Sequence, residues 1–107
     1  ILSSIVPVAA AAAADPRPAS RPSVRRGHGL VYHPGRKAIL LFGGGVALPE
    51  PRMSDLWALK NNTWTRIDTH GPAPRTLCGF AYDSARDRVV VFGGLGGNNN
   101  KYGDTWE

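Results

Sequence analysis

The chain contains an internal repeat, and this repeat constrains its fold more than any other feature. Residue types found from Arg25 onward recur in the same order from Arg75 onward, 50 positions later. The apolar run Ile39-Leu40-Leu41-Phe42-Gly43-Gly44 returns as Val89-Val90-Val91-Phe92-Gly93-Gly94, and an Asp-x-Trp pattern returns after 49 positions. A fixed period of this length indicates that one supersecondary unit is used more than once. The other matched residues are Gly29 and Gly79, Tyr32 and Tyr82, Arg36 and Arg86, Asp55 and Asp104, and Trp57 and Trp106.

Each copy of the repeat is predicted to be a set of short β-strands. The apolar run before Gly43-Gly44 is rich in branched and aromatic side chains and is bounded by glycines, which favours a buried strand over a helix. Pro34-Gly35 and Asn61-Asn62 indicate turns, and a double glycine allows positive φ and a sharp change of direction. The chain has 13 glycines and 9 prolines, which also favours turns and strands over helices. We therefore expect an all-β fold, with antiparallel strands in the first copy at residues 27–32, 37–42, 55–59 and 64–67.

An ordered set of residues that is present in both copies resembles the kelch repeat of β-propellers. The resemblance covers residues 22–107 and implies blades of four antiparallel strands. Residues 25–74 would form one blade and residues 75–107 a second, truncated blade, so the propeller would be incomplete in this chain. Two departures are that Cys78 stands where the first copy has His28, and that the second copy stops before its own fourth strand. The residues that carry the resemblance are Arg25, Tyr32, Gly43, Gly44, Asp55, Trp57 and Trp64, and in the second copy Arg75, Tyr82, Gly93, Gly94, Asp104 and Trp106.

These repeated residues are expected to be structural. The tryptophans of the two Asp-x-Trp patterns should pack against the sheets, because a buried aromatic ring removes a large area from water. Their aspartates are expected to accept backbone hydrogen bonds at the start of the third strand. Trp64 is expected to fill space between blades, and Arg25 and Arg75 are expected to bond neighbouring carbonyl or carboxylate groups.

The N-terminal residues indicate export. Residues 1–14 are apolar and uncharged, end in six alanines, and are too short to span a membrane. They resemble the end of a secretory signal peptide, with Ala12-Ala13-Ala14 as the cleavage match, and the alternative is an Ala-rich linker or helix. Residues 15–24 are rich in proline and suggest an extended spacer. We expect a fragment of a longer protein that is secreted, periplasmic or on the cell surface, of the bacterial exported type, because the chain begins with Ile1 and ends inside an expected strand.

Several classes of function do not fit the sequence. The net charge is +5, but the arginines clustered near the N-terminus have no aromatic residue among them, which argues against nucleic-acid binding. The single cysteine cannot form an internal disulfide or a zinc site, and the three histidines lack metal-ligand spacing. The glycine clusters lack the features of a phosphate-binding loop, and no nucleophile elbow is present. We therefore expect no enzyme activity, cofactor or metal in this chain.

The function that the resemblance implies is a scaffold that binds a protein or carbohydrate ligand. One alternative is a propeller enzyme, such as the copper-dependent galactose oxidases, whose catalytic residues would lie outside this chain. Another is a purely structural module of the cell surface. Fold resemblance by itself does not decide among these functions.

The binding face is predicted from the direction of the strands. Antiparallel strands put alternate connections at opposite ends of a sheet, so the short turns at residues 33–36, 60–63 and 83–87 share one end. The long connections at residues 45–54, 68–74 and 95–103 share the other end, and long divergent loops on a rigid scaffold often bind ligands. Plain spacers are the alternative. Arg52 and Tyr102 are the expected anchors, because interfaces favour arginine and tyrosine. The full predicted set is Glu50, Arg52, Asn99, Lys101 and Tyr102.

Overall fold

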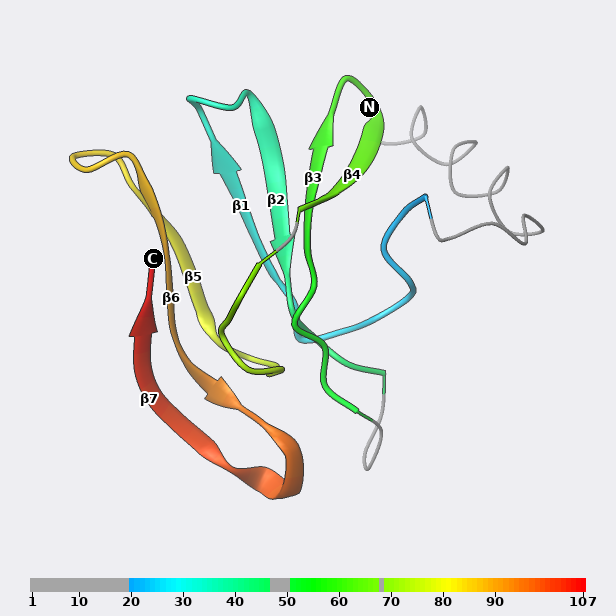
Figure 1. The fold of residues 1–107 in the computed structure, drawn as a ribbon, viewed down its shortest axis with the longest axis vertical. Helices are drawn as coiled ribbons and strands as arrows, with labels where there is room; N and C mark the ends of the chain where they lie inside the picture. The colour runs from blue at the N-terminus through cyan, green and yellow to red at the C-terminus, as the bar shows by residue number, and fades with distance from the viewer. Residues whose placement is uncertain (1–19, 47–50, 68) are drawn as a thin grey trace.

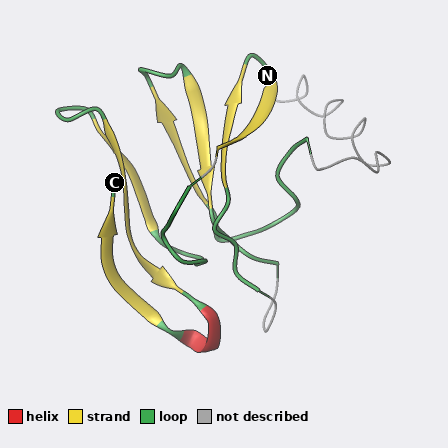
Figure 2. Cartoon of the chain, viewed as in Figure 1, coloured by secondary structure: helices red, strands yellow, loops and turns green. Residues whose placement is uncertain are grey.

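The computed structural model describes residues 20–46, 51–67 and 69–107, and it shows two antiparallel β-sheets (Figures 1 and 2). The prediction of an all-β fold is confirmed, because the described residues form seven β-strands and no α-helix. Within the same residues, no helix could cross a membrane. The proposed signal peptide at residues 1–14, the first half of the spacer (residues 15–19) and Glu50 lie outside the described residues. The first sheet has the order β1-β2-β3-β4, formed by Gly29–His33, Ala38–Phe42, Leu56–Lys60 and Thr63–Ile67.

The bounds of these strands follow from backbone conformation. Gly27 and Lys37 have φ of 70° and 52°, which is outside the β region, so β1 and β2 begin after them. The turn between β3 and β4 has positive φ at both Asn61 and Asn62, as a two-residue hairpin with the twist of the strands requires. Gly43 has a φ of 70° and ends β2. The strands therefore differ from the predicted ranges by one or two residues only.

The second sheet has the order β5-β6-β7, formed by Gly79–Asp83, Arg88–Leu95 and Lys101–Trp106. Here the predicted loop at residues 95–103 is wrong, because Leu95 pairs with Lys101 and Gly94 pairs with Tyr102. A β-bulge between Phe92 and Gly94 absorbs the register shift and lets β6 continue past the double glycine. Only a short connection with one 3-10 turn, η2 (Gly97–Asn99), separates β6 from β7.

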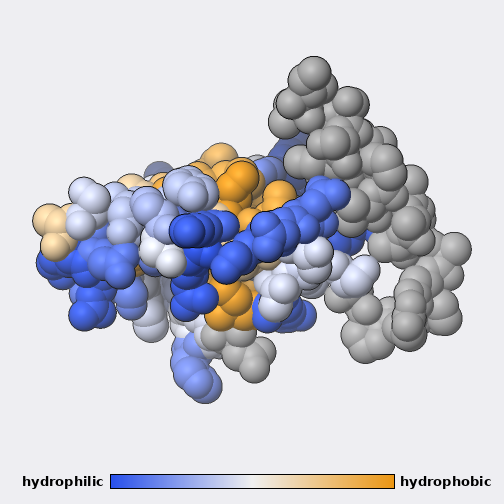
Figure 3. Space-filling view, turned by 90° about the horizontal axis from the view of Figure 1, so that it is seen from above, coloured by the Kyte–Doolittle hydropathy of each residue, from blue (hydrophilic) through white to orange (hydrophobic). Residues whose placement is uncertain are grey.

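The two sheets pack face to face through aromatic side chains. The rings of Phe42 and Phe80 stack with their centroids 6.1 Å apart, and the His33 and Tyr82 rings lie 4.9 Å apart. Gly29 leaves room for Phe80, because a Cβ atom at position 29 would lie 2.6 Å from the Phe80 Cβ. Figure 3 shows hydrophobic side chains in the middle of the molecule, flanked by hydrophilic ones. The buried apolar residues are Ala38, Leu40, Leu41, Phe42, Trp57 and Val91.

Backbone hydrogen bonds also join the sheets, at the end where the long connections lie (Figure 1). Leu77 N donates to Gly27 O over 2.8 Å, and Gly44 N donates to Arg75 O over 2.9 Å. The short turns β1–β2, β3–β4 and β5–β6 lie at the opposite end (Figure 1). The long-connection end is therefore where the two sheets are fastened together.

Candidate functional site

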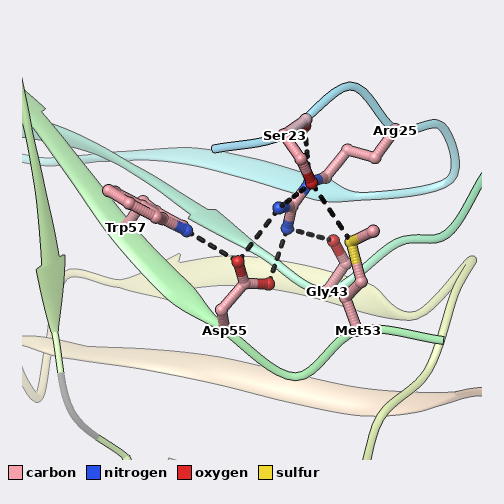
Figure 4. Close-up of polar contacts among 6 residues, drawn as sticks. All are labelled: Ser23, Arg25, Gly43, Met53, Asp55 and Trp57. Atoms are coloured by element: carbon pink, nitrogen blue, oxygen red, sulfur yellow. Dashed lines mark hydrogen bonds and ion pairs between the residues drawn. The ribbon is translucent and has the colours of Figure 1, made fainter. Parts of the chain in front are cut away.

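An arginine, an aspartate and a tryptophan form a hydrogen-bonded cluster at the long-connection end of the first sheet (Figure 4). The Arg25 guanidinium donates to both carboxylate oxygens of Asp55, over 2.6 and 2.9 Å, and to Gly43 O over 3.2 Å. The Trp57 indole N–H donates to the same carboxylate over 2.7 Å. A bidentate, charge-assisted pair of this kind fixes geometry as well as adding energy. The cluster thereby ties the chain before β1 to the end of β2 and the start of β3.

The second sheet builds the same cluster from the second copy of the repeat. Arg75 donates to both oxygens of Asp104, over 2.6 and 3.0 Å, and to Gly93 O over 3.0 Å. The Trp106 indole donates to Asp104 over 2.7 Å. Backbone donors are predicted for the aspartates, but their main partners are these side chains. The arginines bond both carbonyl and carboxylate groups.

The two clusters differ in burial. The Arg25 and Arg75 side chains are both almost completely buried, with 3% and 1% exposed. Trp57 is only 4% exposed, whereas Trp106 is 41% exposed. Among the described strands, β4 covers the edge of β3, but no strand covers the corresponding edge of β7. Trp64 on β4 is half-buried and pairs with Leu59, so in the described residues it contributes to the first sheet.

These contacts change the pKa values of the aspartates. Burial alone would raise the pKa of Asp55, but the hydrogen bonds from Arg25 and Trp57 outweigh it and lower the pKa below its ordinary value of 3.8. The hydrogen bond from Arg75 is the main reason that the pKa of Asp104 lies well below its usual range. In return, the bond to Asp104 raises the pKa of Arg75. Both aspartates are therefore ionised in the folded chain at neutral pH.

The lowered pKa values predict a loss of stability in acid. A carboxyl whose pKa is lower in the folded state than in the unfolded state stabilises the fold above the unfolded pKa, and this contribution is lost as pH falls through the folded pKa. We expect the urea midpoint to fall below about pH 4, and to fall less steeply in Asp104→Asn, which cannot titrate. Some slope should remain, because Asp55 and Asp83 also have lowered pKa values. An identical acid profile for the variant and the unchanged chain would contradict the assignment.

A groove lies beside the clusters, where the two sheets meet. Its volume is about 320 Å³, and its lining comes from both copies of the repeat. Gly45 makes isolated antiparallel bridges to Arg26 and to Arg52, which brings these two arginines to the same site. We call this site the arginine groove. The rest of its lining is Gly27, Gly45, Val46, Thr76, Leu77 and Leu95.

The structure separates the residues that were predicted to line one binding face. Arg52 lines the arginine groove, whereas Asn99, Lys101 and Tyr102 belong to the β6–β7 hairpin. Asn99 and Lys101 are exposed there. The Tyr102 ring instead lies under the Arg75 guanidinium, 4.1 Å from the ring centroid to Cζ, in a cation–π arrangement. Tyr102 therefore supports the buried cluster.

Arg26, Thr76 and Leu77 line the groove, although the sequence did not predict them as binding residues. The doublet Arg25-Arg26 held a usable signal, because side chains alternate along an extended segment, so that one arginine points inward and the next outward. Arg25 is in the buried cluster, and Arg26 is exposed at the groove. Thr76 and Leu77 had no such signal, because their position depends on how the two sheets pack. Within the described ranges, no group of three or more His, Cys, Asp or Glu side chains could hold a metal ion.

Comparison with known proteins gives a local similarity. No family model matches the chain. The chain is similar to the "Dynein alpha chain, flagellar outer arm" of Chlamydomonas reinhardtii, with 32% identity over 72 residues. The match covers 65% of this chain and 2% of the dynein chain, so the chain spans only a small part of that relative.

Proposed function

We propose that this chain is part of an exported kelch-type β-propeller that acts as a binding scaffold for a protein or carbohydrate ligand. The observation that carries the proposal is the arginine groove, which lies where two equivalent sheets are fastened together. The two clusters centred on Arg25 and Arg75 hold the surrounding backbone by the same bonds in both copies. A site on a rigid frame loses little conformational entropy when a ligand binds.

The chemistry of the groove indicates which ligands it favours. Its described lining is mainly apolar, with Arg26 and Arg52 as the charged groups, and mainly apolar sites with a few polar groups are typical of ligand pockets. The planar guanidinium group matches carboxylate, sulfate and phosphate groups in a bidentate manner. The ligand is therefore proposed to carry an anionic group, as an acidic peptide or an acidic glycan does.

This proposal predicts selective loss of binding on substitution of the groove arginines. Peptide and glycan arrays are probed with the labelled full chain, and the strongest acidic ligand is titrated by calorimetry. Arg26→Ala should weaken binding by about tenfold, equivalent to about 1.4 kcal/mol, with little change in Tm, and Arg52→Ala should weaken binding by a similar factor. Arg36→Ala is the matched control, because it removes the same charge from the exposed β1–β2 turn at the opposite end. Equal weakening of binding by Arg36→Ala would show that the groove is not the binding site. Binding of neutral ligands only on the arrays would show the same.

A further inference from the structure

Leu77 is held in a backbone conformation that leucine rarely adopts. Its φ is 57°, in the left-handed region, where a side chain crowds its own backbone. The conformation belongs to the position, because the equivalent residue of the first copy is Gly27, with φ of 70°. The other described non-glycine residues with positive φ are polar and lie in turns or in the β6–β7 connection: Lys37, Asn61, Asn62, Asp87, Asn98 and Asn99. Leucine at position 77 therefore carries strain that glycine would avoid.

The Leu77 side chain lies at the arginine groove and not in the core. It is 72% exposed and belongs to the groove lining. The Leu77 backbone N–H donates to Gly27 O over 2.8 Å, and Leu77 Cδ2 would lie 3.4 Å from a Cβ atom placed at Gly27. The end of the side chain thus reaches back to the first copy of the repeat. The groove that it lines is formed by residues of these two copies.

A ligand explains this leucine better than folding does. An exposed side chain contributes little to stability through burial, so it does not offset the strain of its own backbone. Strained positions cluster at binding and active sites. We infer that Leu77 is the apolar anchor of the arginine groove, and that the ligand is a protein segment with an aliphatic side chain next to an acidic one. The inference rests on the proposed binding role and names the class of its ligand.

The polar groups of the groove favour a protein segment over a glycan. A bound glycan would bring hydroxyl groups to the groove wall, and each needs a hydrogen-bond partner once it is removed from water. The lining offers few partners, because five of its backbone N–H groups already donate to backbone carbonyls: those of Arg26, Gly45, Thr76, Leu77 and Leu95. The Thr76 hydroxyl also donates to Leu95 O, over 3.5 Å. An aliphatic side chain needs no such partner and gains free energy from burial against the apolar lining.

The charges at the groove explain why the neighbouring residue of the ligand is acidic. Arg26 is exposed and Arg52 is half-buried, and both line the groove. The aspartates of the two clusters beside the groove are each paired with the buried arginine of their own cluster, so they do not neutralise Arg26. An aspartate or glutamate of the ligand can therefore form a bidentate pair with Arg26 while the aliphatic side chain contacts Leu77.

The test compares two short synthetic peptides and oligogalacturonate, each titrated into the full chain by calorimetry. The peptides have acidic residues on both sides of a central residue, which is leucine in one and serine in the other. The unchanged chain should bind the leucine peptide about tenfold more tightly than the serine peptide. Leu77→Asn should remove this preference, because asparagine tolerates positive φ but does not supply the apolar contact. Val24→Asn is the matched control and should keep the preference, because Val24 is 84% exposed but does not line the groove.

The melting temperature separates a ligand anchor from a residue that packs in the fold. Leu77→Asn should not lower Tm, because it relieves backbone strain and removes a side chain that is mostly in water. Leu77→Met keeps an apolar side chain and should retain most of the preference for the leucine peptide. A clear fall in Tm for Leu77→Asn would overturn the inference, since Leu77 would then be a packing residue.

The binding data also distinguish failure of this inference from failure of the proposed function. Equal affinity of the unchanged chain for the two peptides would overturn the role of Leu77. Binding of oligogalacturonate that Arg26→Ala weakens, with no binding of either peptide, would overturn the inference and leave the proposed scaffold role intact. If neither the peptides nor the glycan bound, the inference and the proposed anionic ligand would both be wrong.

Discussion

Substituting Phe42 by alanine is expected to lower the free energy of unfolding by about 3–5 kcal/mol, because the change removes a buried aromatic ring and leaves a cavity. The Phe42 ring is 2% exposed and stacks on Phe80 between the two sheets. Native domains have only about 5–15 kcal/mol of stability, so this change should leave a measurable unfolded fraction. Phe42→Leu keeps most of the volume and should cost less, about 1 kcal/mol.

The repeat provides a matched control for this prediction. Phe92 occupies the equivalent position in the second sheet, but it is 56% exposed. Phe92→Ala should therefore change the free energy of unfolding by less than about 1 kcal/mol. The measurement is urea denaturation, followed by tryptophan fluorescence at a concentration low enough to keep the chain monomeric. Equal losses from the two substitutions would mean that the sheets do not pack through Phe42.

Asp55→Asn is expected to cost about 3 kcal/mol, because removing one partner of a buried ion pair leaves the other charge uncompensated. Asparagine has the same shape, so the change removes the charge and little else. The side chain of Arg25, 3% exposed, would lose its counter-charge and one of two strong acceptors. The Trp57 indole bond should be weakened at the same time. The expected result is a lower urea midpoint with an unchanged m-value.

Asp83→Asn is the comparison for the aspartate prediction. Asp83 also bonds an arginine, Arg86, but that arginine is 54% exposed in the β5–β6 turn. Exposed ion pairs contribute little to stability, so this substitution should have a much smaller effect. If Asp83→Asn and Asp55→Asn destabilised the chain equally, burial of the Arg25 cluster would not explain the contribution of the Asp55–Arg25 ion pair to stability.

Local features of the sequence predicted the strands of the first sheet. Ile, Leu and Phe in the run ending at Phe42 leave few alternatives to a buried strand, and Asn61-Asn62 has the residues that a tight hairpin needs. The all-β fold and the sharp turn after β2 could be predicted for the same reason. Each depends on residues that are close together in the chain.

Features that depend on distant residues could not be predicted in the same way. The β6–β7 hairpin extends through Leu95 and Lys101 because a bulge shifts its register, and the glycines and asparagines between them suggested only a loop. The pairing of Arg25 with Asp55 joins residues 30 positions apart. The arginine groove requires Arg26 and Thr76 to approach each other across two sheets. Neither the composition nor the periodicity of the sequence predicts how closely the two sheets pack, so the groove could not be predicted.

One repeat builds the same unit twice, and the two units pack face to face. The most direct test is a nuclear Overhauser measurement on the monomeric chain with selectively labelled phenylalanine, tyrosine and histidine. Face-to-face packing predicts cross-peaks between the Phe42 and Phe80 rings and between the His33 and Tyr82 rings, whose centroids lie 6.1 and 4.9 Å apart. Cross-peaks within each sheet, with none between these two pairs of rings, would contradict it.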